Sequence, residues 1–185
     1  IGIQFFLDSD GWREIEIVDP RKVEIFGAET EGSLTRQGGG TELFLESVEP
    51  SIDELPFERF FRRFPEGVYT FRAVDNEGTV QIGRVNFSHD IPAGPEIVSP
   101  LPAAGAECAL HVPLPVVISW NPVSESFTGD PLEITRYEVI VENEDVHFDV
   151  KLPAETGTQL TVSFELLRPG IAYIFEVLAI EAGGN

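Results

Sequence analysis

The sequence is poor in cationic and sulfur-containing side chains, and each shortage excludes a class of protein. Its 185 residues include one cysteine, Cys108, no methionine, and 12 Lys and Arg against 32 Asp and Glu, for a formal net charge of -20. A single cysteine cannot form an internal disulfide. A field of this sign repels a phosphate backbone or an anionic membrane surface, so we expect no nucleic-acid partner. No apolar run approaches the roughly 20 residues that cross a bilayer, so we expect no membrane span.

The sequence also lacks the residue patterns of enzymes and transition-metal sites. His89, His111 and His147 are far apart, and neither a Cys-x-x-Cys pair nor a Gly-x-Ser-x-Gly segment occurs. Cys108 stands in Ala-Glu-Cys-Ala-Leu, without a basic neighbour to stabilise a thiolate. We therefore predict that the chain is not an enzyme.

A proline-rich stretch divides the sequence into two acidic halves. Residues 91–95 hold two prolines and a glycine between strand-like runs. Residues 1–94 contain 9 basic and 18 acidic side chains, against 3 and 14 in residues 95–185. Because proline fixes φ and removes a donor, this stretch predicts a stiff hinge with a restricted range of angles. We predict a first domain over 1–90 and a second over 96–185.

Alternating apolar residues predict strands through the first half. Residues 3–7 and 15–17 alternate on either side of Asp10-Gly11, which favours a primed turn and hence a hairpin. A further turn at 19–22 adds a third strand to this meander. Gly38-Gly39-Gly40 is interpreted as a flexible turn. Another strand is predicted at 42–46, and two more at 68–74 and 80–87 are joined by a turn at 75–78.

One helix interrupts these strands. Ser51 and Glu54 have the spacing of a capping box, and Pro56 suits an early helical position. The predicted helix, near 54–63, turns a phenylalanine-rich face to the core. Its exposed side carries three arginines: Arg59, Arg62 and Arg63.

The second half consists of short alternating runs at near-regular spacing, which is typical of a β-sandwich. Its strands are predicted at 96–99, 116–120, 134–142, 147–152, 159–164 and 172–180.

Three of its segments are similar to a fibronectin type III module over about 90 residues. They are Val-Ile-Ser-Trp ending at Trp120, the run 134–139 around Tyr137, and Leu-Arg-Pro-Gly-Ile-Ala-Tyr ending at Tyr173. The resemblance implies that Trp120 fills the core, that Tyr137 packs beside it, and that Tyr173 forms a tyrosine corner. Such modules serve adhesion, spacing and recognition, so the resemblance implies a fold more than an activity.

The first half echoes this pattern at residues 64–71, where a Pro, a Gly and Tyr69 lead into a strand. We interpret it as a divergent immunoglobulin-like domain with an inserted helix. The expected fold class is all-β, with two β-sandwich domains in tandem. The whole resembles uncharacterised secreted bacterial proteins, which implies a secreted, extracellular or cell-surface location. A start at Ile1 without methionine indicates a processed or excised piece.

A fibronectin type III module has a last strand after the loop that residues 181–185 resemble, and the sequence stops there. Two interpretations stay open. In one, the chain is truncated and the strand follows in the intact protein. In the other, a neighbouring subunit supplies the strand, with residues 1–7 as the donor, and head-to-tail exchange builds a filament. The second leads to our first hypothesis of function, a non-catalytic structural or adhesion module that self-associates through the open edge of its second domain.

The alternative hypothesis is an accessory module for calcium or carbohydrate. Asp8 and Asp10 resemble the start of a calcium loop, and Asp90 lies near the hinge. Asp8-Ser9-Asp10-Gly11 is more commonly a plain hairpin turn. Trp12 and Phe127 are the aromatic side chains that we expect on the surface, where rings stack on sugars, although a hairpin tryptophan more often packs across strands.

Overall fold

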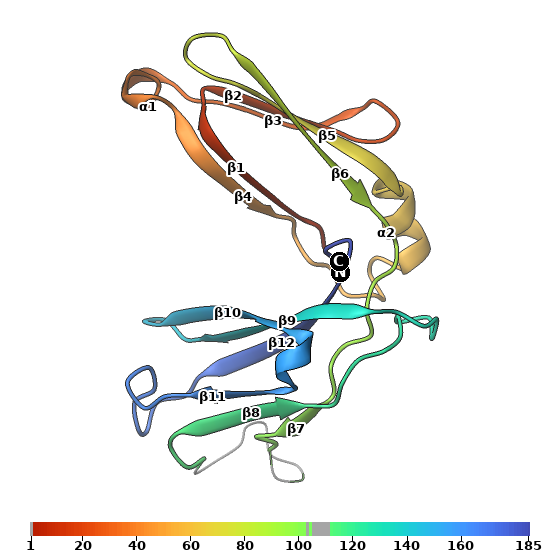
Figure 1. Cartoon of the computed structure of the whole chain (residues 1–185), viewed down its shortest axis with the longest axis vertical. Helices are drawn as coiled ribbons and strands as arrows, with labels where there is room; N and C mark the ends of the chain where they lie inside the picture. Colours follow the sequence, from red (N-terminus) through yellow and green to blue (C-terminus); the bar gives the residue numbers. More distant parts are fainter. Residues whose placement is uncertain (1, 103, 105–111) are drawn as a thin grey trace. The chain divides into compact units, whose positions relative to one another are not determined.

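The computed structural model describes residues 2–102, 104 and 112–185. Cys108 and His111 lie outside the described residues. The chain forms two compact units, Ile1–His89 and Asp90–Asn185 (Figure 1). No helix among the described residues is long and apolar enough to cross a membrane.

The first unit is a β-sandwich that carries short helices. One sheet has the strand order β3-β2-β5-β6, and the other pairs β1 with β4. Alternation along β2 and β5 turns Ile17, Tyr69 and Phe71 toward the facing sheet, where they meet Phe5 of β1. In chain order the elements are β1 (Gln4–Trp12), β2 (Glu14–Val18), β3 (Glu24–Glu29), α1 (Gly32–Gln37), β4 (Gly40–Glu46), α2 (Phe57–Arg63), β5 (Gly67–Val74) and β6 (Val80–Phe87).

Strand β1 departs from the expectation. It runs through Asp10-Gly11 to Trp12 and pairs antiparallel with β4 rather than with β2. Gly11 has a φ of 155°, and the register with β4 shifts between Asp8 and Trp12. The glycine therefore makes an irregularity within a continuing strand. The predicted hairpin at Asp10-Gly11 and the three-stranded meander are wrong, whereas the β2–β3 and β5–β6 hairpins are confirmed.

Helix α2 begins at Phe57, later than the predicted start near 54. Ser51 and Glu54 do make the reciprocal contacts of a capping box, with Glu54 N donating to Ser51 Oγ at 3.3 Å and Ser51 N to Glu54 Oε2 at 3.1 Å. They close a separate turn because the residue before Pro56 is disfavoured in helical conformation. Helix α1 was not predicted, since it buries no side chain and shows no apolar period.

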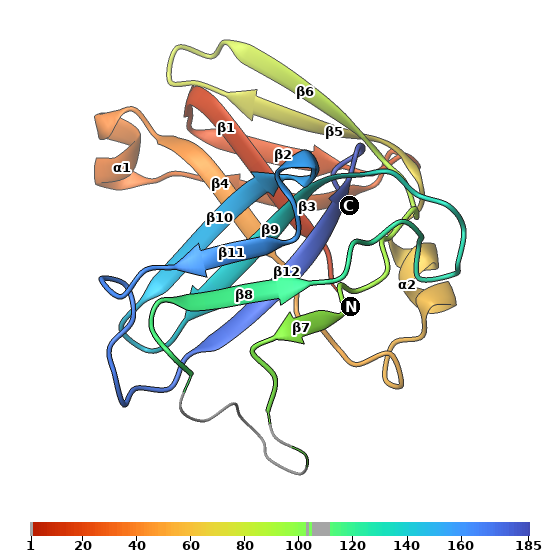
Figure 2. The same ribbon diagram turned by 60° about the horizontal axis from the view of Figure 1, so that its bottom comes forward.

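The second unit is also a β-sandwich (Figure 2). Its sheets have the orders β11-β8-β7 and β10-β9-β12. Its elements are β7 (Ile97–Ser99), β8 (Val116–Trp120), β9 (Ile134–Glu142), β10 (His147–Pro153), the 3-10 turn η1 (Ala154–Thr156), β11 (Gln159–Val162) and β12 (Ile174–Glu181). The predicted all-β class with two sandwiches in tandem is confirmed.

The two units share one pattern of strand pairing. In each, a strand in one sheet (β1 or β8) is followed by a hairpin in the other sheet (β2–β3 or β9–β10). The next strand returns to pair with the first (β4 or β11), and the one after it pairs with the hairpin (β5 or β12). The units differ at their edges. The first unit has β6 beside β5, and the second has β7 beside β8.

The proline-rich stretch belongs to the second unit. Ala93 N donates to Glu125 O and Phe127 N donates to Ile91 O, both at 3.0 Å. On the other side, His89 closes the first unit, where its ring stacks on Phe61 at 3.9 Å between centroids. Residues 91 and 93 therefore pair with a loop of the second sandwich.

Candidate functional site

The outer edge of β12 is the candidate site. Strand β12 lies at the end of the order β10-β9-β12, and it pairs with β9 along its whole length. Among the described residues, no strand pairs with its other edge. Alternate backbone N–H and C=O groups of an edge strand point away from its one partner, so this edge is a template for an added strand.

The backbone after β12 forms a tight turn. Glu181 N donates to Asn185 O at 2.9 Å, and Gly184 N donates to Glu181 O at 3.1 Å. The Glu181 side chain, 7% exposed, accepts from Gly183 N at 2.5 Å and from Asn185 N at 3.1 Å. A buried carboxylate thus holds a tight turn at the end of β12.

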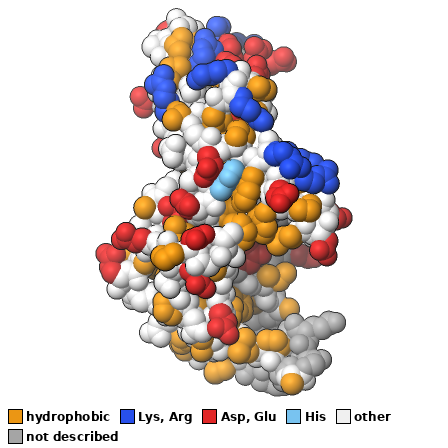
Figure 3. Space-filling view, turned by 90° about the vertical axis from the view of Figure 1, so that its right-hand side faces the viewer, with side chains coloured by type: hydrophobic (Ala, Val, Ile, Leu, Met, Phe, Trp, Pro, Cys, Tyr) orange, Lys and Arg blue, Asp and Glu red, His pale blue; other side chains and the backbone are white. Residues whose placement is uncertain are grey.

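The outer face of β12 carries exposed apolar side chains on either side of the exposed Glu176. Ile174 is 65% exposed and Leu178 is 39% exposed. Leu178 lies opposite Glu138 of β9, whose carboxylate pairs with Lys151 Nζ at 3.1 Å. Partial burial raises the pKa of Glu138, and Lys151 opposes the rise. The neighbours of β12 in its own sheet therefore favour an apolar or basic partner over an acidic one. In the first unit, Lys and Arg side chains gather on the face shown in Figure 3.

The aromatic residues of the resemblance hold the second sandwich together. Trp120 and Tyr137 are each 2% exposed, and their rings meet edge to face at 5.3 Å. Tyr137 Oη accepts from Val123 N at 2.9 Å. Tyr173 Oη accepts from Arg168 N at 3.0 Å, which fixes the approach to β12.

The first unit has its own version of this corner. Tyr69 is fully buried, and its hydroxyl donates to Pro65 O at 3.1 Å. Burial raises the pKa of Tyr69 to about 12. Trp12 ends β1 as Trp120 ends β8, and the spacing from Trp12 to Tyr69 is close to that from Trp120 to Tyr173. This repeated spacing is the signal in the sequence that could have predicted a buried Trp12.

Trp12 is buried, with 8% of its surface exposed. The expectation of an exposed ring for a sugar is therefore wrong for this residue. The alternation that starts at Ile3 would place Trp12 on the outer face, but the register shift between Asp8 and Trp12 breaks it. Trp12 therefore faces inward and packs against Ile15 and Ala73.

The exposed aromatic residues of the first unit are Phe6 and Phe44, which sequence reasoning missed. They lie directly opposite each other on β1 and β4 and are 62% and 61% exposed. Whether two outward-facing side chains lie opposite each other depends on how distant strands pair. The Phe6–Phe44 pair could therefore be predicted only by knowing the β1–β4 register.

The acidic residues predicted for calcium belong to both units. Asp8 and Asp10 are exposed on β1 in the first unit, and Asp90 belongs to the second. Within the described ranges, no group of three or more His, Cys, Asp or Glu side chains is placed to hold a metal ion.

Phe127 is half-buried in a loop organised by Ser126. Ser126 Oγ accepts from Thr128 N at 3.3 Å and from Asp130 N at 3.2 Å. The backbone of Phe127 binds the proline-rich stretch, so the loop anchors the start of the second unit.

No family model and no curated protein matches the sequence. Among solved structures, the chain is similar to a segment of two fibronectin type III domains from chicken tenascin, at 11% identity and a TM-score of 0.32, over 98% of this chain and 86% of that chain. It is also similar to a tetra-tandem repeat in the extending region of a large adhesion protein, at 15% identity and a TM-score of 0.30, over 96% of this chain and 40% of that chain.

The strand order of the chain itself defines both units as antiparallel β-sandwiches. Each sandwich has a tyrosine at the entry to the strand that pairs with the hairpin, and the second has a buried tryptophan and tyrosine across its core.

Proposed function

We propose that the chain is a non-catalytic structural or adhesion module that acts outside the cell or at its surface. The open edge of β12 is its interaction site, where a strand from a second copy adds to the sheet. Because each copy would accept at β12 through a different surface from the one that it offers, repeated addition builds an open filament.

The observation that carries this proposal is that no strand in the described part of the chain pairs with the outer edge of β12, where Ile174 and Leu178 are exposed. Added strands bind by backbone hydrogen bonds, and side chains on alternate positions select them. Residues 1–7 are not a free donor, contrary to our expectation, because β1 is already paired with β4. The donor is therefore another strand edge of the second copy.

Association is tested by light scattering after size-exclusion chromatography over a concentration series, with electron microscopy for filaments. We expect Ile174→Lys to weaken association by about tenfold, since a lysine blunts an exposed strand edge. The matched control is Val117→Lys, which is 42% exposed on the central strand β8 and should leave association unchanged.

Two results would overturn the proposal. The first is a wild-type chain that stays monomeric at the highest concentration. The second is equal weakening by both lysine variants, which would mean that general charge rather than the β12 edge controls association.

The second candidate, an accessory module for carbohydrate or calcium, is favoured by one surface. Phe6 and Phe44 form an exposed aromatic pair, with Asp8 opposite Glu42 next along the same strands. Binding of a glycan that Phe44→Ser abolishes would support this candidate. A larger rise in melting temperature with calcium than with magnesium would support the calcium form.

A further inference from the structure

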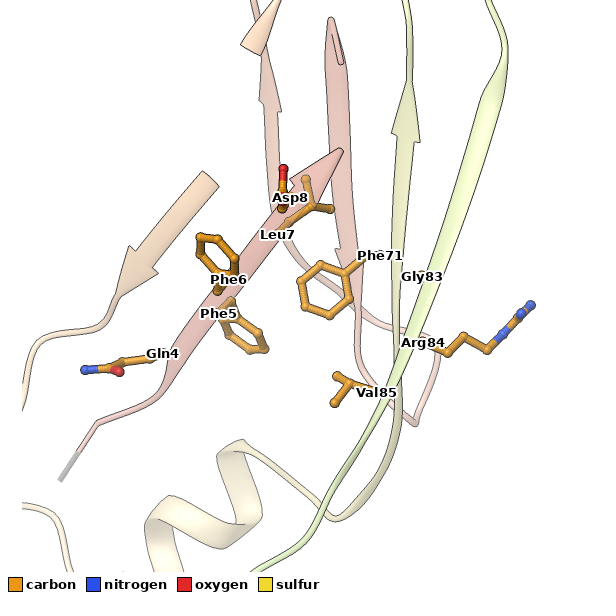
Figure 4. A pocket seen from close by; sticks show the side chains of 9 residues that line it. All are labelled: Gln4, Phe5, Phe6, Leu7, Asp8, Phe71, Gly83, Arg84 and Val85. Atoms are coloured by element: carbon orange, nitrogen blue, oxygen red, sulfur yellow. The ribbon is translucent and has the colours of Figure 1, made fainter. Parts of the chain in front are cut away.

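One side of the first sandwich is open. A groove of about 340 Å³ runs between β1 and β6 (Figure 4). It exists because a two-stranded sheet faces a four-stranded one. Within the part of the chain that the structure describes, β1 has a partner on one edge only, and no strand lies across from the inward face of β6.

The floor of this groove is apolar. Phe5, Phe71 and Val85 point toward one another across it, whereas Arg84 points away. Val85 is 42% exposed although it is opposite the buried Tyr69 in the sheet. The side chain of Val85 therefore faces the core, but no other side chain in the described part of the chain shields it fully from solvent.

The second unit shows what fills the equivalent place. Strand β8 corresponds to β1, and β7 pairs antiparallel with it through Ile97 opposite Trp120. Ile97 packs against the core of the second unit. In the sequence, β7 is a short apolar run flanked by Pro95 and Pro100.

We propose that the groove beside β1 binds an extended polypeptide segment with the chemistry of β7. The segment pairs antiparallel with residues 4–8, and its alternate apolar side chains cover Phe71 and Val85. It is an unpaired segment rather than the edge of a second folded copy, because its side chains must enter between the two sheets. This inference concerns a different edge from the proposed function and does not rest on it.

The test uses the full chain and a labelled peptide of residues 93–101. We expect saturable binding by fluorescence anisotropy, with slower amide hydrogen exchange at residues 4–8. A peptide with Ile97→Asp should bind at least about tenfold more weakly, since a carboxylate would enter an apolar groove.

A substitution at Gly83 tests the groove without altering the rest of β6. A Cβ there would meet only the Cβ of Phe71 at 3.7 Å, an ordinary contact, so Gly83→Val should fold and fill the groove. We expect it to abolish peptide binding. The matched control is Ile82→Val, one residue away on the opposite face, which should bind as the wild type does.

A tethered form removes any dependence on peptide affinity. The same nine residues, fused ahead of Ile1 through a flexible Gly-Ser linker, have a high effective concentration. We expect the fusion to raise the melting temperature of the first unit by several degrees, and Gly83→Val to cancel the rise.

The inference is overturned if the fusion changes neither the melting temperature nor exchange at residues 4–8. It is also overturned if the peptide protects β12 alone. Dimerisation that Gly83→Val abolishes would overturn it as well, because a second copy would then cover the groove.

Discussion

Two tyrosines at corresponding corners give a matched pair of substitutions. Tyr69 is fully buried and donates to Pro65 O, while Tyr173 is half-buried and accepts from Arg168 N. Removing a hydroxyl leaves the partner unsatisfied, which costs about 1–3 kcal/mol when the partner is buried and less when water can reach it. We expect Tyr69→Phe to lower the free energy of unfolding more than Tyr173→Phe, measured by urea denaturation. The reverse order would contradict the role of burial.

The carboxylate of Asp19 joins two elements of the first unit. It is 1% exposed and accepts from Arg21 N, Val23 N and Arg21 Nε at 2.7 to 2.9 Å. The guanidinium of Arg21 in turn donates to Arg62 O and Arg63 O at the end of α2, both at 3.0 Å. Burial acts to raise the pKa of Asp19, but the hydrogen bonds from Val23 and Arg21 outweigh it and hold the pKa below its usual value.

A carboxylate with a lowered pKa stabilises the fold above its unfolded pKa of about 4, and that stability is lost as the pH falls through the lowered value. We expect Asp19→Asn to cost about 2 kcal/mol at neutral pH. The difference in stability between the variant and the wild type should narrow as the pH falls below about 4, which thermal melting across the acid range measures. Asp8→Asn, at an exposed carboxylate, is the control. A constant difference down to the lowest pH would contradict the assignment.

At the scale of elements, the turn from α1 into β4 is fitted against Trp12. A Cβ at Gly40 would lie 2.8 Å from Trp12 Cζ2, and one at Gly39 would overlap the carbonyl oxygen of Trp12. Gly39 also has a φ of 87°. The glycine run is therefore a close packing contact, whereas the sequence was interpreted as a flexible turn.

This fit predicts that Gly40→Ala destabilises the first unit by about 1–3 kcal/mol, as overpacking does in a closed core. Gly83→Ala is the matched control, because its Cβ would make only an ordinary contact. Denaturant titration measures both. Similar values for the two variants would mean that the Trp12 ring moves aside freely.

The sequence was sufficient to predict the elements that depend on neighbouring residues. Alternation gave the strands, and the turns at 19–22 and 75–78 joined the hairpins that form. The prediction failed where the pairing of a strand depends on residues far away in the sequence. Gly11 has a positive φ, but β4 pairs with β1 on both sides of it, with Leu43 opposite Leu7 and Gly40 opposite Trp12, so the strand continues past the glycine. The exposed pair Phe6 and Phe44 was missed for the same reason, because β2, β3 and α1 separate the two residues in the sequence.

For the whole molecule, the two units complement each other. Among the described residues, β6 of the first unit has no counterpart in the second and β7 of the second has none in the first, so no described strand lies at the corresponding edge of each. The open edge of β12 was predictable, because the fibronectin type III resemblance supplies the number of strands. The open groove beside β1 was not, because the expected β1–β2 hairpin would have hidden it.

Net charge decides how these edges behave in solution. Residues 1–89 carry 9 basic and 17 acidic side chains, and residues 90–185 carry 3 and 15, so copies repel one another. Salt shortens the range of this repulsion from about 30 Å at 0.01 M to about 8 Å at 0.15 M. Association through backbone pairing at β12 should therefore strengthen as salt rises over that range, measured by light scattering. The alternative contact, between the exposed arginines of α2 and the acidic second unit of another copy, would weaken instead. The sign of the salt dependence thus separates strand addition from charge pairing, and a decrease would exclude the β12 edge as the main contact.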